Sequence, residues 1–269
     1  LVLNTGSTAG NITTNTINGA QSISFTAGSG TIDTGVIGGS TAITGLTYSA
    51  DAITLDSNIT IDGNVSITGA STLGAAVTID TNNTGTDGNI TLGTVDGNNT
   101  LTLDSGAGNV SVGVIGGDTA LSGLTINTAG AAGDDGDITL AGIGDGTPTY
   151  GVVGTVDVGN SRTDLLKFTG TSYDIDTGTA TFEAKAGAGT IEIDSSSAVE
   201  FITDGTNITF DTGSIKLSGG SSTKITTGGT GAGAVQIDGA IDSNTNTAEN
   251  LTIISGTGNL VVDGAIGAN

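Results

Sequence analysis

The sequence predicts an all-β protein, a parallel β-solenoid, and three observations lead to this fold class. First, triplets of an apolar, a small polar and another apolar residue recur along the 269 residues, as in Ile53-Thr54-Leu55 and Ile208-Thr209-Phe210. Second, Gly, Asn and Asp separate the triplets, as is typical of turns between strands. Third, the triplets return at regular intervals. Since alternate residues of a strand point to opposite sides, each triplet offers two inward side chains and one outward side chain.

A long repeat at a constant offset indicates stacked structural units in the first half. The segment Gly10-Asn11-Ile12-Thr13 returns as Gly88-Asn89-Ile90-Thr91, and, at the same offset, Gly45-Leu46-Thr47 returns as Gly123-Leu124-Thr125. Self-similarity at a fixed period is the signature of a solenoid. We interpret each long repeat as three coils of about 26 residues.

A shorter period in the second half predicts the coil itself. Three series of triplets recur there about every 25 residues, which predicts three short strands per coil, wound right-handed as parallel crossovers are. The expected inward columns are Leu166/Ile191/Ile215, Phe168/Ile193/Leu217 and Ile175/Phe201/Ile225. The expected outward columns, with ion pairs between coils, are Lys167/Glu192/Lys216 and Asp174/Glu200/Lys224.

The outer surface divides one continuous rod into two sections. Residues 1–145 are expected to carry a Thr/Ser-rich outer face, and residues 146–269 a charged one, since all five basic residues lie between Arg162 and Lys224. The irregular stretch Ala129–Gly154 is predicted to be a protruding loop or a junction. Leu1 is not an initiator Met, so we expect a segment of a longer or processed polypeptide.

Charge and composition exclude several classes of partner and site. The formal net charge of -22 argues against nucleic acid and anionic membrane surfaces, which require cationic patches. No apolar run approaches the length that spans a membrane, so we expect no membrane insertion. The chain has neither His nor Cys, which excludes Ser-His-Asp and Cys-His catalysis and ordinary zinc sites.

Carboxylate pairs leave one enzymatic alternative, a carbohydrate-active β-helix. Asp174/Asp176 and Glu192/Asp194 have the chemistry of an acid and a base. Sugar-cleaving grooves normally present aromatic platforms, however, whereas this chain has no Trp and a single Arg, Arg162. We therefore predict no catalytic residues and no required cofactor.

One acidic cluster has the composition of a calcium site. Asp134, Asp135 and Asp137 lie in the segment Gly133-Asp134-Asp135-Gly136-Asp137, and calcium prefers several oxygen ligands. The segment matches neither the EF-hand loop nor the nonapeptide of calcium-binding β-rolls. A hydrated acidic turn is the competing and favoured interpretation.

Asn-Xaa-Thr/Ser sequences offer two interpretations, glycosylation or turn structure. A turn Asn followed by an apolar-polar-apolar strand generates this pattern by itself. The sequence occurs, among other positions, at Asn11, Asn58, Asn64, Asn89, Asn109, Asn207 and Asn250.

Segments such as Asn64-Val65-Ser66-Ile67-Thr68-Gly69 and Gly258-Asn259-Leu260-Val261-Val262-Asp263-Gly264 resemble the repeat region of large bacterial secreted surface proteins, the filamentous-haemagglutinin-like and autotransporter-like β-solenoid adhesins. The resemblance implies an extracellular or cell-surface location and a non-catalytic structural segment of a fibre or adhesin. Implied partners are other copies of the chain, adjoining repeats of a longer chain, and surface carbohydrate. The composition also resembles some phage tail fibres, so a carbohydrate-binding or receptor-binding fibre is a further alternative.

Overall fold

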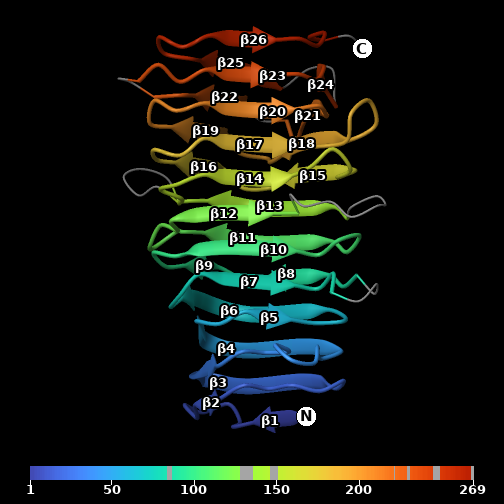
Figure 1. The fold of residues 1–269 in the computed structure, drawn as a ribbon. Coiled ribbons are helices and arrows are strands. Elements are labelled where there is room, and N and C mark those ends of the chain that lie inside the picture. Colours follow the sequence, from blue (N-terminus) through green and yellow to red (C-terminus); the bar gives the residue numbers. More distant parts are fainter. Residues whose placement is uncertain are drawn as a thin grey trace.

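The fold is a parallel β-solenoid, as predicted. The computed structural model describes residues 1–83, 87–127, 136–145, 151–220, 222–228, 231–244 and 249–267. Within these residues the chain forms about ten stacked coils and no helix. The coils follow one axis, with the two termini at opposite ends of the stack (Figure 1).

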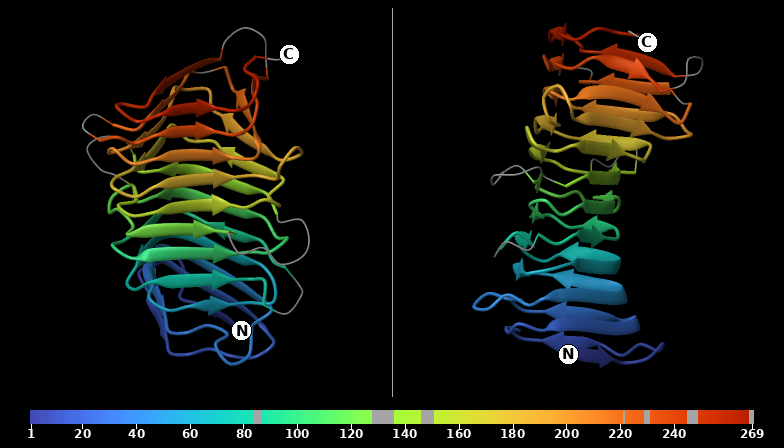
Figure 2. Two further views of the ribbon diagram at one scale, coloured as in Figure 1. Left: turned by 45° about the horizontal axis from the view of Figure 1, so that its top comes forward. Right: turned by 90° about the vertical axis from the view of Figure 1, so that its right-hand side faces the viewer.

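Three faces surround the core of each coil, as the turned views in Figure 2 make clear. The first and second faces together form a 17-stranded sheet, and the third face is a 9-stranded sheet. The first face holds β1 (Val2–Asn4), β8 (Ile90–Leu92), β15 (Leu165–Phe168), β18 (Thr190–Asp194), β21 (Ser214–Ser218) and β24 (Ile241–Ser243). The second face holds β2 (Ile12–Thr14), β9 (Val95–Asp96), β16 (Ser172–Ile175), β19 (Val199–Thr203), β22 (Ser222–Thr226) and β25 (Asn250–Ile254).

Longer strands cross the corner between the first two faces. They are β3 (Ser22–Thr34), β4 (Gly45–Leu55), β6 (Val65–Leu73), β11 (Val110–Ile115) and β13 (Ile138–Ile143). The third face holds β5 (Ile59–Thr60), β7 (Val77–Asp80), β10 (Thr100–Asp104), β12 (Gly123–Ile126), β14 (Val156–Gly159), β17 (Ala180–Glu183), β20 (Ile208–Asp211), β23 (Val235–Ile237) and β26 (Leu260–Val262). The expectation of short strands is therefore wrong for the early coils, where register shifts at Gly28 let β3 turn the corner without ending.

The outward column at the centre of the first face gives the length of each coil. In order it contains Val2, Ser24, Thr47, Ser66, Thr91, Ser111, Thr139, Lys167, Glu192, Lys216 and Asp242. The mean interval is roughly 24 residues, close to the predicted 25. On this face the column changes from hydroxyl to charged side chains between Thr139 and Lys167.

Apolar residues of successive coils stack into inward columns. Leu166 pairs with Ile191, which pairs with Ile215, and all three are buried, as predicted. The predicted column of Phe168, Ile193 and Leu217 is also confirmed. Burying these side chains provides the main driving force for folding, and each full burial contributes about 1.5–3 kcal/mol.

The third predicted inward column, Ile175/Phe201/Ile225, is wrong in its first member, which lies two residues earlier in the chain. Tyr173, and not Ile175, lies opposite Phe201, which in turn lies opposite Ile225. The rings of Tyr173 and Phe201 stack with centroids 4.6 Å apart, and the Tyr173 hydroxyl donates a hydrogen bond to the carbonyl oxygen of Leu140 at 2.9 Å. Since a shift of two residues keeps every side chain on its own side of the strand, ring packing selects the register.

The same shift corrects an outward column. Ser172, and not Asp174, lies opposite Glu200. Glu200 pairs with Lys224 as predicted, with 2.6 Å between Oε1 and Nζ. The ion pair predicted between Lys167 and Glu192 is also present, at 3.2 Å.

An asparagine ladder joins successive coils at one corner. The Asn89 N–H donates to Asn64 Oδ1 at 2.9 Å, the Asn109 N–H to Asn89 Oδ1 at 2.8 Å, and the Asp137 N–H to Asn109 Oδ1 at 2.9 Å. The position before Asn89 requires glycine, because a Cβ on Gly88 would lie 1.9 Å from a carbonyl oxygen of the preceding coil.

Turn structure explains most of the Asn-Xaa-Thr/Ser sequences. Six of these asparagines accept a backbone hydrogen bond from the next coil: Asn11, Asn58, Asn64, Asn89, Asn109 and Asn207. The pattern therefore follows from the solenoid corner itself, as the second interpretation of these sequences expects.

The long repeat of the first half does not correspond to three whole coils. Ile12 pairs with Ile32 on the second face, whereas its counterpart Ile90 pairs with Val65 on the first face. Likewise, Leu46 lies on the first face and its counterpart Leu124 on the third. The second copy of the repeat therefore lies three and two-thirds coils further along the solenoid than the first. The early coils are shorter than the late ones, since Thr47 already meets its partner of the next coil at Ser66.

The stretch Ala129–Gly154 is only partly as predicted. Its central part contains β13, which pairs with β11 before it and with β15 and β16 after it. The sheet therefore continues through this region, so the prediction of a loop or junction is wrong for β13. The rest of that prediction falls mainly on 129–135 and 146–150, outside the described residues.

Candidate functional site

The structure describes one of the three candidate calcium ligands. Asp134 and Asp135 lie outside the described residues. The Asp137 backbone belongs to the corner ladder, since its N–H donates to Asn109 Oδ1 and its carbonyl oxygen accepts from the Val110 N–H at 2.8 Å. Among the described residues, no group of three or more acidic side chains is placed to hold a metal ion.

The carboxylate pair Glu192/Asp194 belongs to an ion-pair network. Lys167 Nζ lies 3.2 Å from Glu192 Oε2 and 2.6 Å from Asp194 Oδ2. The hydrogen bond from Lys167 to Asp194 raises the pKa of this lysine, followed by smaller contributions from Glu192. Ser218 Oγ also donates to Glu192 Oε1 at 2.9 Å. These carboxylates are therefore held by neighbouring coils on the first face.

The second carboxylate pair, Asp174/Asp176, leads to a groove on the second face. The groove has a volume of about 540 Å³ and lies over strands β16, β19, β22 and β25. Its outward column consists of Ser172, Glu200, Lys224 and Thr252 in register. Asp174 lies next to this column, and Asp145 lines the rim. We call this hollow the Asp174 groove.

Asp174 is a buried carboxylate with an unsatisfied oxygen. Its exposed fraction is 3%, and its Oδ1 atom has no hydrogen-bond partner among the described residues. Burial, and after it the negative charges of Glu200 and Asp176, together raise the pKa of Asp174 from 3.8 to about 6. Glu200, in contrast, is neutralised by the ammonium of Lys224 at 2.6 Å.

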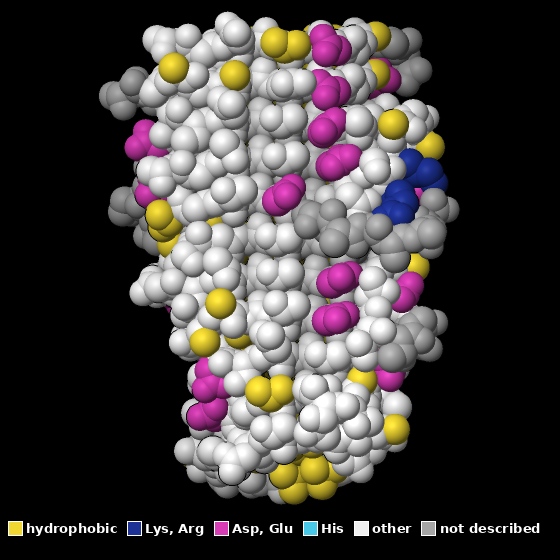
Figure 3. All heavy atoms as spheres, in the orientation of Figure 1, with side chains coloured by type: hydrophobic (Ala, Val, Ile, Leu, Met, Phe, Trp, Pro, Cys, Tyr) yellow, Lys and Arg dark blue, Asp and Glu magenta, His cyan; other side chains and the backbone are white. Residues whose placement is uncertain are grey.

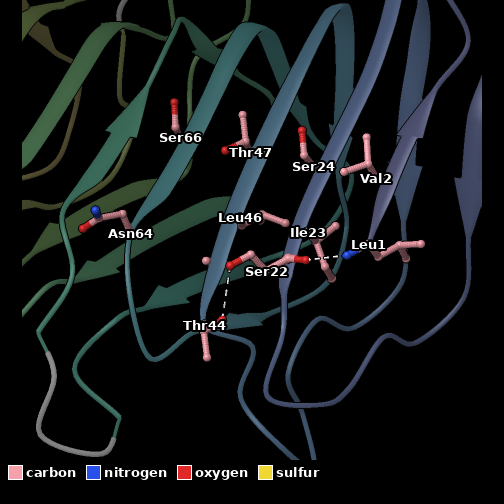
Figure 4. A pocket seen from close by; sticks show the side chains of 11 residues that line it. Leu1, Val2, Ser22, Ile23, Ser24, Thr44, Leu46, Thr47, Asn64 and Ser66 are labelled. Carbon is pink, nitrogen blue, oxygen red and sulfur yellow. Dashed lines mark hydrogen bonds between the residues drawn. The ribbon is translucent and has the colours of Figure 1, made fainter.

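A second hollow, of about 360 Å³, lies over the first coils (Figure 4). The side chains of Val2, Ser24, Thr47 and Ser66 stand in a row along it. The Leu1 ammonium donates to the carbonyl oxygen of Ser22 at 2.7 Å. This hollow contains hydroxyls and no side-chain carboxylate, so it has less capacity for charge recognition than the Asp174 groove.

Acidic side chains also form a file along one edge of the third face (Figure 3). Asp80 lies opposite Asp104, and Glu183 lies opposite Asp211. Burial is the main cause that raises the pKa of Asp80, Glu183 and Asp211, and repulsion from the neighbouring carboxylates adds to it. This file repels anions but contains no convergent metal-binding group among the described residues.

The aromatic residues contribute to the core. Seven of the eight aromatic residues are buried, and Tyr150 is outside the described residues. The seven are Phe25, Tyr48, Phe168, Tyr173, Phe182, Phe201 and Phe210. No described ring is therefore available as a stacking platform on the surface.

The sequence identified Asp174 as half of a carboxylate pair but missed its burial. Regular alternation placed this side chain on the solvent side, where an acidic residue is ordinarily solvated. The two-residue register shift leaves Asp174 on the same side of its strand, so neither alternation nor register carries a signal of this burial.

Comparison of the chain with protein-family models, with curated proteins and with solved structures gave no match. No helix in the described part of the chain has the length and apolar character needed to cross a membrane.

Proposed function

We propose that the chain is a structural segment of an extracellular cell-surface fibre or adhesin, which extends by stacking coil on coil. The observation that supports this most directly is the exposure of core-column side chains in the coil that contains β26. Leu260 continues the column of Val235, and Val262 continues the column of Ile237. Val235 and Ile237 are fully buried, whereas 48% of Leu260 is exposed.

The terminal coils offer both apolar surface and strand edges for association. Leu260 and Ile266 at one end, and Leu1 at the other, are large exposed apolar side chains that continue core columns. An edge strand presents N–H and C=O groups that pair readily with another strand. A further coil, from adjoining repeats or from a second copy, buries this surface and continues the parallel ladder.

The remaining features support a non-catalytic, surface role. Sugar-cleaving grooves normally present accessible aromatic platforms, and the described rings are used in the core. The net charge of -22 disfavours nucleic acid as a partner. The extracellular location rests on the resemblance to secreted β-solenoid adhesins, and surface carbohydrate is the external partner that we propose.

Sedimentation velocity and negative-stain electron microscopy test the stacking. We expect straight rods whose lengths are multiples of one solenoid and whose proportion rises with protein concentration. Leu260→Lys places a charge in the open core column and is expected to leave single solenoids. Ser111→Lys adds the same charge to the outward column of the first face and should not reduce stacking. A wild-type protein that remains a single solenoid at every concentration would refute the proposal.

A further inference from the structure

We propose that the Asp174 groove binds a ligand that carries a primary ammonium group and hydroxyl groups, the chemical class of the amino sugars. The inference goes beyond the structural role and does not depend on end-to-end stacking, because the groove lies on the side of the solenoid.

The first argument is the unsatisfied carboxylate. A buried polar atom without a partner is uncommon in folded proteins and incurs a desolvation penalty. Asp174 Oδ1 is such an atom, and Asp174 lines the groove. A ligand that donates a hydrogen bond to this oxygen would satisfy it, and a charged N–H donor forms the stronger bond.

The second argument is the charge of the groove. Asp145, Asp174 and Glu200 line it together with one cation, Lys224. Lys224 forms an ion pair with Glu200, so the carboxylates of Asp145 and Asp174 set the remaining charge. This field favours a cationic group and disfavours phosphate, sulfate and acidic sugars.

The third argument is the hydroxyl lining, which favours an organic ligand over a bare metal ion. Five of the twelve lining residues are Ser or Thr, including Ser172 and Thr252 in the outward column. Such groups both donate to and accept from the hydroxyls of a sugar. The acidic residues do not converge as a metal site in the described part of the chain. A volume of about 540 Å³ is within the usual range for small-molecule sites.

Titration calorimetry with a glucosamine trisaccharide, compared with its N-acetylated form, tests the inference. We expect the amine form to bind, its affinity to fall as salt is added, and the acetylated form to bind at least tenfold more weakly. Asp174→Asn keeps the size of the side chain and removes its charge, so it should weaken amine binding at least tenfold. The matched control, Asp118→Asn, changes an exposed carboxylate outside the groove and should leave binding unchanged.

Circular dichroism melting separates loss of the site from loss of the fold. Weaker binding counts in favour of the proposal only if Asp174→Asn melts at or above the wild-type temperature. An unfolded Asp174→Asn protein would overturn it, because the charged side chain would then be required for the fold. Equal binding of the two trisaccharides, unchanged binding by Asp174→Asn, no binding by the wild type, or Asp174-dependent binding of Ca²⁺ in place of the amine would overturn it too.

Discussion

Replacing Asp174 by Asn is expected to stabilise the folded protein at neutral pH. The side chain is 3% exposed and one of its oxygens lacks a partner, so ionisation of Asp174 is costly in the folded state. A folded-state pKa of about 6 against 3.8 corresponds to about 3 kcal/mol of stability lost when the carboxyl ionises in the fold. The amide still has to be buried, so we expect a net gain of about 2 kcal/mol at pH 7.

The sign of the pH dependence follows from the raised pKa. Protonated Asp174 contributes its full stability below pH 3.8, and this contribution is lost as the pH rises through about 6. The advantage of Asp174→Asn should therefore be largest at pH 7 and disappear near pH 4. For a chain of this size, about 2 kcal/mol corresponds to roughly 4–8 °C in Tm.

Thermal unfolding of the wild type and of Asp174→Asn, followed by circular dichroism between pH 4 and pH 7, measures this difference. Asp118→Asn, which changes an exposed carboxylate, should stay within about 0.5 kcal/mol of the wild type at each pH. A variant that is less stable than the wild type at pH 7, or an advantage that is the same at pH 4 and pH 7, would refute the reasoning.

Three further predictions concern the corners and the charged face. Gly88→Ala should destabilise the protein by about 3 kcal/mol or more in urea unfolding, since the new Cβ would lie 1.9 Å from the Gly63 carbonyl oxygen. The control, Gly187→Ala, should cost about 1 kcal/mol, because Gly187 has a φ of +73° but open space around it. Asn127→Ala should cost about 2–3 kcal/mol, because Asn127 is buried, has a φ of 48° and accepts a hydrogen bond from the Ser105 N–H at 2.8 Å. A smaller loss for Asn127→Gly would measure the part of this cost that comes from the positive φ, and equal losses for the two variants would contradict a backbone contribution. Lys167→Met should cost about 1 kcal/mol or less at low salt and close to nothing at 1 M salt, so a large loss that does not depend on salt would exclude an electrostatic origin.

The architecture was predictable because the strands and the coils obey simple geometric rules. Alternation decides which side chains enter the core, and a constant interval decides which of them stack. The partners of Leu166 and Phe168 in the next coil could therefore be predicted from the sequence alone. The corner asparagines were also predictable, since the same turn recurs before each strand.

What the sequence could not provide was the register at positions where two alignments satisfy the same alternation. The strand containing Tyr173 fits its neighbour in two ways, and stacking on Phe201 decides between them. The Asp174 groove depends on this choice, because the shift puts Ser172, and not Asp174, opposite Glu200. The interpretation of the long repeat as three coils was wrong because it assumed that the early coils have the length of the late ones.

The displacement of the copies of the long repeat by two thirds of a turn has a consequence for multivalent recognition. A segment such as Gly45-Leu46-Thr47 and its counterpart occupy different faces, so one sequence is compatible with more than one side of the solenoid. Duplication of such a unit points each new copy of a surface patch in another direction around the axis. Under the proposed role as a surface fibre, a rod extended in this way would display its patches on all sides, and its avidity would not depend on how the rod is rotated toward its target.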